Sequence, residues 1–117
     1  MDNGNVRMQQ YNKAMIVEAY SRDKITSADI EWVFESLHSK FKPPFSIIFI
    51  KSGNYWLTKN AQLRLYLDNE LLKVAYVVKK RESKHHALNA SETYLQNKEV
   101  FICDSIDSAY QALIGDL

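Results

Sequence analysis

The sequence predicts an α/β protein with a mixed β-sheet and the element order β-β-α-β-α-β-α-β-α. Short apolar runs rich in β-branched residues alternate with stretches whose apolar residues recur every three or four positions. The chain also opens with two strand-like runs only two residues apart, which is typical of a hairpin. Alternating strands and helices favour a partly parallel sheet with right-handed crossovers, and the hairpin adds an antiparallel edge.

The opening hairpin is predicted from residues 5–11 and 14–20, with Asn12-Lys13 as the turn. In the second run, Met15 and Val17 alternate with neighbours that are also largely apolar. We therefore expect this strand to have apolar character on both of its faces.

The first helix is predicted to begin at Thr26, because Asp29 follows three residues later in an N-terminal capping pattern. Its apolar residues lie on one helical face, namely Ile30, Val33, Phe34, Leu37 and Phe41. Pro43 and Pro44 end it, because the residue before a proline avoids the α region.

Residues 45–50 form an apolar run that predicts a central strand buried on both faces. A polar turn follows, and Thr58 is the predicted cap of the second helix. We expect this helix to bury Ala61, Leu65 and Leu72, with Leu63, Leu67 and Leu71 beside them. Asp68 and Asn69 fall late in this helix, near its predicted end.

The rest of the chain continues the alternation of strands and helices. Residues 74–78 predict a second continuous apolar strand, and residues 80–95 a third helix with Leu88, Tyr94 and Leu95 on its face. Residues 100–103 predict the last strand. Ser105 caps a final helix that carries Ile106, Ala109, Tyr110 and Leu113 and ends at Gly115.

Composition places the 117 residues in one globular domain, residues 1–117, with 46% hydrophobic and 25% charged residues. The net charge of +1 gives no bulk field that would favour nucleic acid. The single cysteine, Cys103, excludes an internal disulfide framework and fits a reducing compartment. Neither a signal-peptide pattern nor an apolar run of membrane-spanning length is present, so we expect a cytoplasmic protein without a transmembrane segment.

Three stretches carry a resemblance to a known family: NGNVRMQQYNKAMIVEAYSRDKITSADIEW, FSIIFIKSGNYWLTKNAQLRLYL, and KVAYVVKK together with EVFICDSIDSAYQAL. Their order resembles the STAS domain, and more closely the SpoIIAA-like (STAS/SEC14-like) small bacterial proteins. The resemblance spans nearly the whole chain and implies a SpoIIAA/STAS-like fold. It rests on element order and pattern, because no invariant motif is shared.

In STAS regulators that antagonise anti-sigma factors, the start of the second main helix carries a phosphorylatable serine. The matching place here is Leu57-Thr58-Lys59-Asn60. The family's Asp, Ser pair and Gly are missing, and only the Thr58 hydroxyl remains. Thr58 is thus foremost a helix N-cap, and the resemblance adds the alternative of a phosphorylation switch.

Two further segments are candidate binding sites. Tyr55 and Trp56 lie in the turn before Thr58, where large aromatic side chains either pack on the core or form a partner contact. Lys79, Lys80, Arg81 and Lys84 follow an apolar strand, at the end where open sheets bind ligands. They form either a solvated loop or an anion contact.

The sequence lacks the parts of a catalytic or metal site. His85 and His86 are adjacent and point apart, and no Cys-x-x-Cys, G-x-S-x-G or phosphate-binding glycine motif is present. Cys103, at the end of an apolar strand, is expected to be a buried, inert thiol. We therefore expect no enzyme, no cofactor and no metal.

The predicted function is a non-catalytic STAS/SpoIIAA-like regulatory or protein-interaction domain, whose partner is another protein or a second copy. The alternative is a carrier of a small apolar or anionic ligand, held in an apolar pocket under the helices. Four aromatic residues would line such a pocket: Trp32, Phe34, Tyr66 and Tyr94. A basic run as short as 79–84 does not suit nucleic acid.

Overall fold

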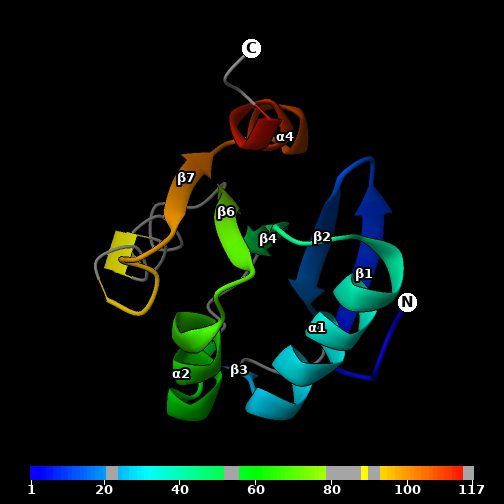
Figure 1. Ribbon diagram of the computed structural model, residues 1–117, viewed down its shortest axis with the longest axis vertical. Helices are drawn as coiled ribbons and strands as arrows, with labels where there is room; N and C mark the ends of the chain where they lie inside the picture. The colour runs from blue at the N-terminus through cyan, green and yellow to red at the C-terminus, as the bar shows by residue number, and fades with distance from the viewer. Residues whose placement is uncertain (21–23, 52–55, 79–87, 90–92, 115–117) are drawn as a thin grey trace.

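A five-stranded mixed sheet forms the centre of the protein. The structure is a computed structural model, and it describes residues 1–20, 24–51, 56–78, 88–89 and 93–114 (Figure 1). The strands lie in the order β1-β2-β4-β6-β7. Their bounds are β1 (Val6–Tyr11), β2 (Ala14–Ala19), β4 (Phe45–Lys51), β6 (Leu71–Val78) and β7 (Glu99–Cys103). β1 is antiparallel to β2 and the other three pairings are parallel, which confirms the predicted mixed sheet with a hairpin at one edge.

A second, two-stranded sheet was not predicted. β3 (Lys24–Ile25) pairs in parallel with β5 (Trp56–Leu57), and each strand has only two residues. Strands this short have no periodicity for sequence analysis to detect. The amide of Thr58 donates to the carbonyl of Ile25 at 3.0 Å, so this small sheet ties together the starts of the first two helices.

The three named helices lie on the two faces of the large sheet. α1 (Ser27–Lys40) and α2 (Lys59–Leu67) contribute to one core cluster, and α4 (Ile106–Ile114) packs against the opposite face. The capping box predicted for α1 is present, with the Thr26 side chain accepting from the Asp29 amide. Figure 1 shows α1 and α2 at the bottom of the view and α4 at the top.

Alternate residues of the strands supply the two core clusters. Ile47 and Phe49 of β4 contribute to the cluster under α1 and α2, while Ile48 contributes to the cluster under α4. Phe49 stacks on Tyr76 of β6 with ring centroids 5.5 Å apart. The burial of β4 on both faces confirms the prediction of a central strand.

The predicted second helix was too long. α2 ends at Leu67, and Leu71 and Leu72 already belong to β6. The Asp68 side chain accepts hydrogen bonds from the amides of Glu70 and Leu71, so it turns the chain out of the helix. As a result Leu71 is buried but Leu72, which was expected on the buried helical face, is 48% exposed.

The predicted third helix lies mostly outside the described residues. Leu88 and Asn89 are helical, whereas residues 93–97 form turns. Leu95 is buried against the main core, as the prediction required. The final strand and helix are close to prediction, and the Ser105 hydroxyl accepts from the Ser108 amide at 3.1 Å.

Candidate interaction surface on helix α2

Helix α2 is apolar on two opposite sides. Ala61 and Leu65 are fully buried against the core. Leu63 and Leu67 each lie two residues from Leu65, which is about 200° around a helix. They are 54% and 61% exposed, and Tyr66 beside them is 38% exposed. We call Leu63, Tyr66 and Leu67 the α2 stripe.

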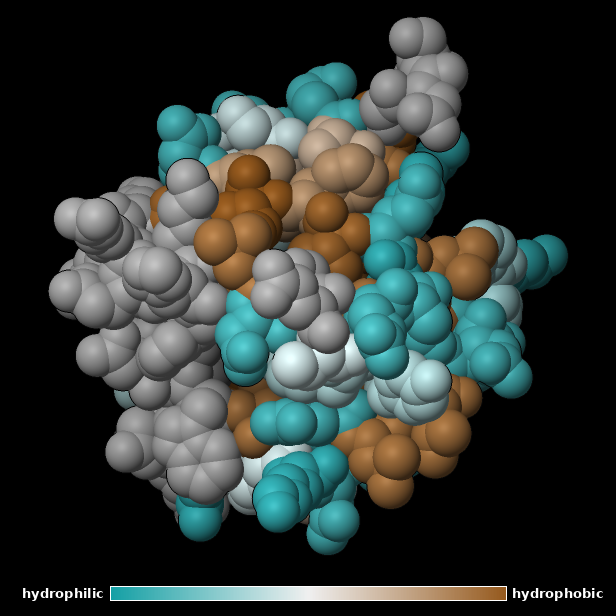
Figure 2. Space-filling model, turned by 90° about the vertical axis from the view of Figure 1, so that its left-hand side faces the viewer, coloured by the Kyte–Doolittle hydropathy of each residue, from teal (hydrophilic) through white to brown (hydrophobic). Residues whose placement is uncertain are grey.

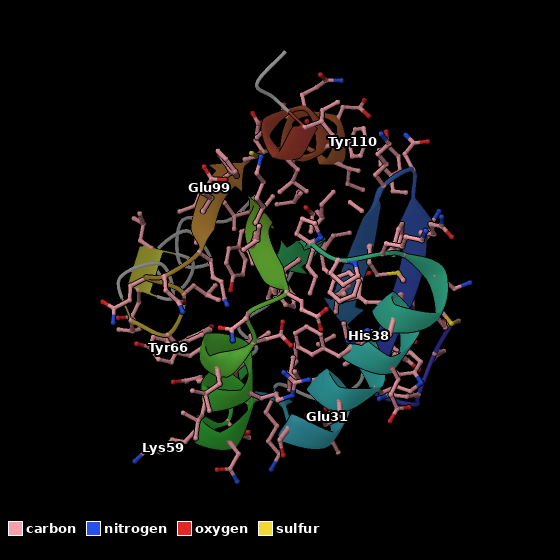
Figure 3. The ribbon with its side chains drawn as sticks, in the orientation of Figure 1. Glu31, His38, Lys59, Tyr66, Glu99 and Tyr110 are labelled. Atoms are coloured by element: carbon pink, nitrogen blue, oxygen red, sulfur yellow. The ribbon has the colours of Figure 1, made fainter. Side chains whose placement is uncertain are left out.

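The α2 stripe is a contiguous surface, because its members are separated by one, three and four residues along one helix. Single exposed leucines are normal on a protein surface, but adjacent ones are informative. Three side chains exposed to this degree make a patch on the order of 300 Å², the size at which apolar patches of monomers are often functional. Figure 3 shows Tyr66, together with Lys59 one turn before Leu63, on the outer side of α2.

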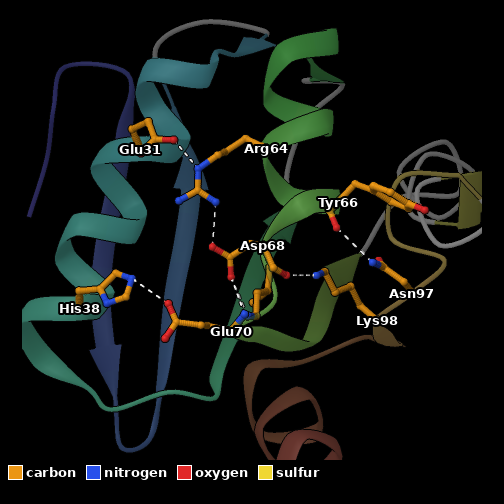
Figure 4. A network of polar contacts seen from close by, with 9 residues as sticks. Glu31, His38, Arg64, Tyr66, Asp68, Glu70, Asn97 and Lys98 are labelled. Carbon is orange, nitrogen blue, oxygen red and sulfur yellow. Dashed lines mark hydrogen bonds and ion pairs between the residues drawn. The ribbon is translucent and has the colours of Figure 1, made fainter.

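Arg64 fixes α2 against α1 from the inner side. Its Nε donates to Glu31 of α1, and its Nη1 donates to Asp68 at 2.8 Å (Figure 4). The guanidinium also lies 4.2 Å from the centre of the Phe34 ring, a cation–π contact. Burial acts to lower the pKa of Arg64, but its two carboxylate partners outweigh burial and raise that pKa, so Arg64 stays charged.

Asp68 closes the C-terminal end of α2. One carboxylate oxygen accepts from the Glu70 and Leu71 amides at 2.9 and 2.8 Å, and the other accepts from Arg64. Burial acts to raise the pKa of Asp68, but the hydrogen bonds from Arg64 and the two amides outweigh it and lower that pKa. The carboxyl group is therefore ionised at neutral pH.

Two side chains from the segment before β7 satisfy carbonyls at the same helix end. Asn97 Nδ2 donates to the Tyr66 carbonyl at 3.1 Å, and Lys98 Nζ donates to the Asp68 carbonyl (Figure 4). The last carbonyls of a helix have no partner within the helix, so these bonds stabilise its terminus. Contacts from α1 and from the segment before β7 thus hold α2 in one position and leave the stripe on its outer side.

A search of solved structures finds a protein of the same architecture. It is an uncharacterised protein of the DUF3478 family from Shewanella loihica, whose crystal structure is described as having a SpoIIAA-like fold. The two superpose with a TM-score of 0.63 at 16% sequence identity, over 92% of this chain and 91% of that one. This chain has a SpoIIAA-like fold. No protein-family profile matches the sequence. No curated protein matches it either.

In this SpoIIAA-like fold, Thr58 is the N-cap of α2, as predicted. Its Oγ1 accepts from the Ala61 amide at 3.3 Å. Phosphorylation of this hydroxyl stays a prediction. The partner contacts predicted at Tyr55 and the Trp56 side chain lie outside what the structure describes, although the backbone of Trp56 belongs to β5.

The predicted basic loop also lies outside the described residues, with Lys79, Lys80, Arg81 and Lys84, and so do His85 and His86. Elsewhere in the described chain, no group of three or more His, Cys, Asp or Glu side chains is placed to hold a metal ion. Within those same ranges, no helix is long and apolar enough to span a membrane.

The four aromatic residues expected to line a ligand pocket lie in different surroundings. Phe34 is buried in the core beneath Arg64, whereas Trp32 and Tyr94 are half-buried at the margin of that core. Tyr66 belongs to the exposed α2 stripe. Because one is in the core interior and another faces solvent, they do not form the wall of a single pocket.

Hollows lie instead at the carboxyl ends of the parallel strands, beside the start of α4. One of about 360 Å³ is lined by Tyr11, Ile50, Val77 and residues 104–107. Another of about 450 Å³ is lined by Val78, Ile102, Cys103, Asp104 and Ser108. Open α/β sheets bind ligands at this end of their strands.

Cys103 is half-buried at one of these hollows, which corrects the expectation of a buried thiol. Burial and, secondarily, the nearby Asp104 raise the pKa of Cys103. The thiol is therefore largely protonated at neutral pH, and its chemical inertness stays a prediction.

The sequence analysis did not predict the α2 stripe or the contacts that hold α2, although sequence patterns indicate part of both. Leu63, Leu65 and Leu67 alternate, and alternate positions of a helix cannot all face one core. Arg64 and Asp68 have the spacing of a helical ion pair. Lys98 and Asn97 could not be found in this way, because they approach α2 only through the tertiary fold.

Proposed function

We propose that this SpoIIAA-like domain is a non-catalytic protein-interaction domain, and that a partner protein binds it through the α2 stripe. The observation that carries the proposal is the outward apolar face of a helix already anchored by its inner face. Leu63 and Leu67 are more than half exposed, while Leu65 between them is fully buried. Burying such side chains against a partner stabilises a complex by roughly 25 cal/mol for each Å² of apolar surface.

The held position of α2 supports the same proposal. Binding by a surface that is already ordered loses little conformational entropy, so more of the contact energy appears as affinity. Tyr66 adds an aromatic side chain, a residue type enriched among the residues that dominate binding energies. Exposed Lys59, one turn before Leu63, favours a partner with an apolar centre and a carboxylate at that edge.

The proposal is tested with the double variant Leu63→Ser/Leu67→Ser. Immobilised wild type, the double variant and a control variant, Glu35→Ser on the exposed side of α1, are each used to retain proteins from lysate. Candidates are then purified, and the dissociation constant of each binary complex is measured by calorimetry. We expect a partner whose affinity falls at least tenfold with the double variant and stays unchanged with Glu35→Ser.

Urea unfolding of the double variant distinguishes a lost contact from a lost fold. Because Leu63 and Leu67 are exposed, the double variant is expected to unfold at nearly the same urea concentration as wild type. If every confirmed partner binds the folded double variant as tightly as wild type, the α2 stripe is not the interaction surface.

A second candidate function is the carrying of a small ligand, and the hollow of about 450 Å³ favours it. Val78 lines this hollow, and Lys79 follows directly in the chain. The apolar part of its lining, Val78, Ile102 and Cys103, suits a small apolar ligand, whereas the Asp104 carboxylate in the same lining disfavours an anionic group there. Native mass spectrometry followed by a denaturing measurement of the same sample is the test. A monomer that releases a small molecule on denaturation supports the carrier, and identical masses in both measurements contradict it.

A further inference from the structure

The two outer edges of the large sheet differ. The outer side of β1 is bonded to the N-terminal segment: the Met8 amide donates to the Met1 carbonyl at 2.7 Å, and the Asn3 amide donates to the Val6 carbonyl at 3.1 Å. The Met1 amino group also donates to the Met8 carbonyl at 2.9 Å. β7 lies at the opposite edge and, among the strands that the structure describes, pairs with β6 alone.

After the exposed Glu99, the side chains of β7 are apolar but incompletely covered. Residues 100–103 are each half-buried, whereas residues 74–78 of the neighbouring β6 are all buried. Figure 2 faces this side of the molecule and shows hydrophobic side chains gathered at the level of β7 and α4. An apolar edge strand is a site for pairing with another strand, and proteins that keep such an edge generally cover it or use it.

We propose that β7 pairs with β7 of a second copy of this chain, in antiparallel orientation about a two-fold axis through Phe101. Pairing of identical edges about a two-fold axis is necessarily antiparallel and joins the two sheets into one. In this register Phe101 faces its own copy and Val100 faces Ile102. The contact uses other residues than the α2 stripe, so it is independent of the proposed function.

Charge complementarity selects this register. The strand is flanked by Lys98 and Asp104. With Phe101 at the axis, Lys98 of each copy stands opposite Asp104 of the other, at both ends of the paired segment. The Lys98 ammonium has three donors and uses one on the Asp68 carbonyl of its own chain, so it can also meet this carboxylate. The neighbouring two-fold registers, centred on Val100 or on Ile102, would set Lys98 opposite Ile102 or Asp104 opposite Val100, so neither of them pairs the two charges. Asp104 is exposed, so its carboxylate can meet the Lys98 ammonium of the second copy.

The size of the edge limits the strength of the dimer. Five residues of strand span roughly 17 Å, so the interface lies at the small end of specific protein interfaces. We therefore expect a concentration-dependent equilibrium between monomer and dimer. Sedimentation equilibrium over a range of concentrations should show an average mass that rises from one subunit towards two.

A disulfide at the axis tests the register. In a Cys103→Ser background, Phe101→Cys places two thiols directly opposite each other, where Cα atoms are about 4.5–5.5 Å apart and a disulfide can form. The control Ile102→Cys in the same background places its thiols beyond the roughly 7 Å limit. Mild oxidation should link the first variant into a covalent dimer at least tenfold faster than the second.

Asp104→Lys provides the second, independent variant, because residue 104 is exposed and the change should leave the fold intact. It sets Lys98 against a lysine at both ends of the interface. The dimer dissociation constant should rise at least tenfold, while Glu35→Lys on α1, an equal charge change elsewhere, should leave it unchanged. A monomer at every concentration, equal oxidation rates of the two cysteine variants, or an unchanged constant for Asp104→Lys would each overturn the proposal.

Discussion

Replacing Asp68 should separate the contacts that anchor α2. In Asp68→Asn, the amide oxygen can still accept from the Glu70 and Leu71 amides, but Arg64 loses one of its two carboxylate partners and keeps only Glu31. In Asp68→Ala all three bonds are lost, and the buried Leu71 amide is left without its acceptor. Hydrogen bonds to charged groups contribute about 1.5–3 kcal/mol each, and Arg64 is partly exposed, which places its contribution at the low end. We therefore expect losses of unfolding free energy of about 1.5 kcal/mol for Asn and about 4 kcal/mol for Ala.

Urea denaturation followed by circular dichroism at pH 7 measures both values. The stabilisation by Asp68 also depends on pH. The folded-state pKa of Asp68 is below its ordinary value of 3.8, so its ionised form stabilises the fold above that pH. This contribution is lost as the pH falls through the folded-state pKa. The gap between wild type and Asp68→Asn should therefore narrow below pH 4. Equal losses for Asn and Ala, or a gap that does not change with pH, would refute the reasoning.

Three further predictions follow from the same structure. Thr58→Ala should lower the unfolding free energy by about 1 kcal/mol and Thr58→Ser by much less, because the hydroxyl caps α2; equal urea midpoints for the two variants would contradict this. Leu65→Ala should cost about 2–5 kcal/mol and Leu63→Ala under about 0.5 kcal/mol by the same measurement, since only Leu65 is buried. Cys103 should react with iodoacetamide at pH 7.5 more slowly than free glutathione, because its pKa is raised; a matching rate by mass spectrometry would argue against a protonated thiol.

Elements with strong local signals could be predicted from the sequence. The two N-caps, Thr26 and Thr58, depend on a hydroxyl and an amide three residues away, so nearby sequence is sufficient. β4 was predictable because an apolar run of β-branched residues, buried on both faces, is needed at the centre of a parallel sheet. The hairpin was predictable even without a strong turn motif, and Asn12 adopts the positive φ of 54° that such a turn uses.

The end of α2 shows where local patterns fail. Leu65 and Leu72 share a helical face when the helix is continued, so periodicity alone extended it to residue 72. The Asp68 carboxylate instead accepts two amides beyond the helix and is neutralised by Arg64, which is itself held by Glu31 of another helix. These contacts together end the helix, and one of them involves Glu31, which is more than thirty positions away in the sequence.

The sequence by itself determined the SpoIIAA-like order of strands and helices, because hydrophobic periodicity and capping are properties of adjacent residues. Only the tertiary structure decided which side of α2 is buried and which is presented. The helix has leucines on two opposite sides. The side that carries Leu65 is covered by α1, the sheet and the segment before β7, and the side that carries Leu63 and Leu67 is exposed. The same is true of the sheet edges: β1 and β7 are both short strands in sequence, but only packing gives β1 the cover of residues 1–3 and places β7 at the opposite edge.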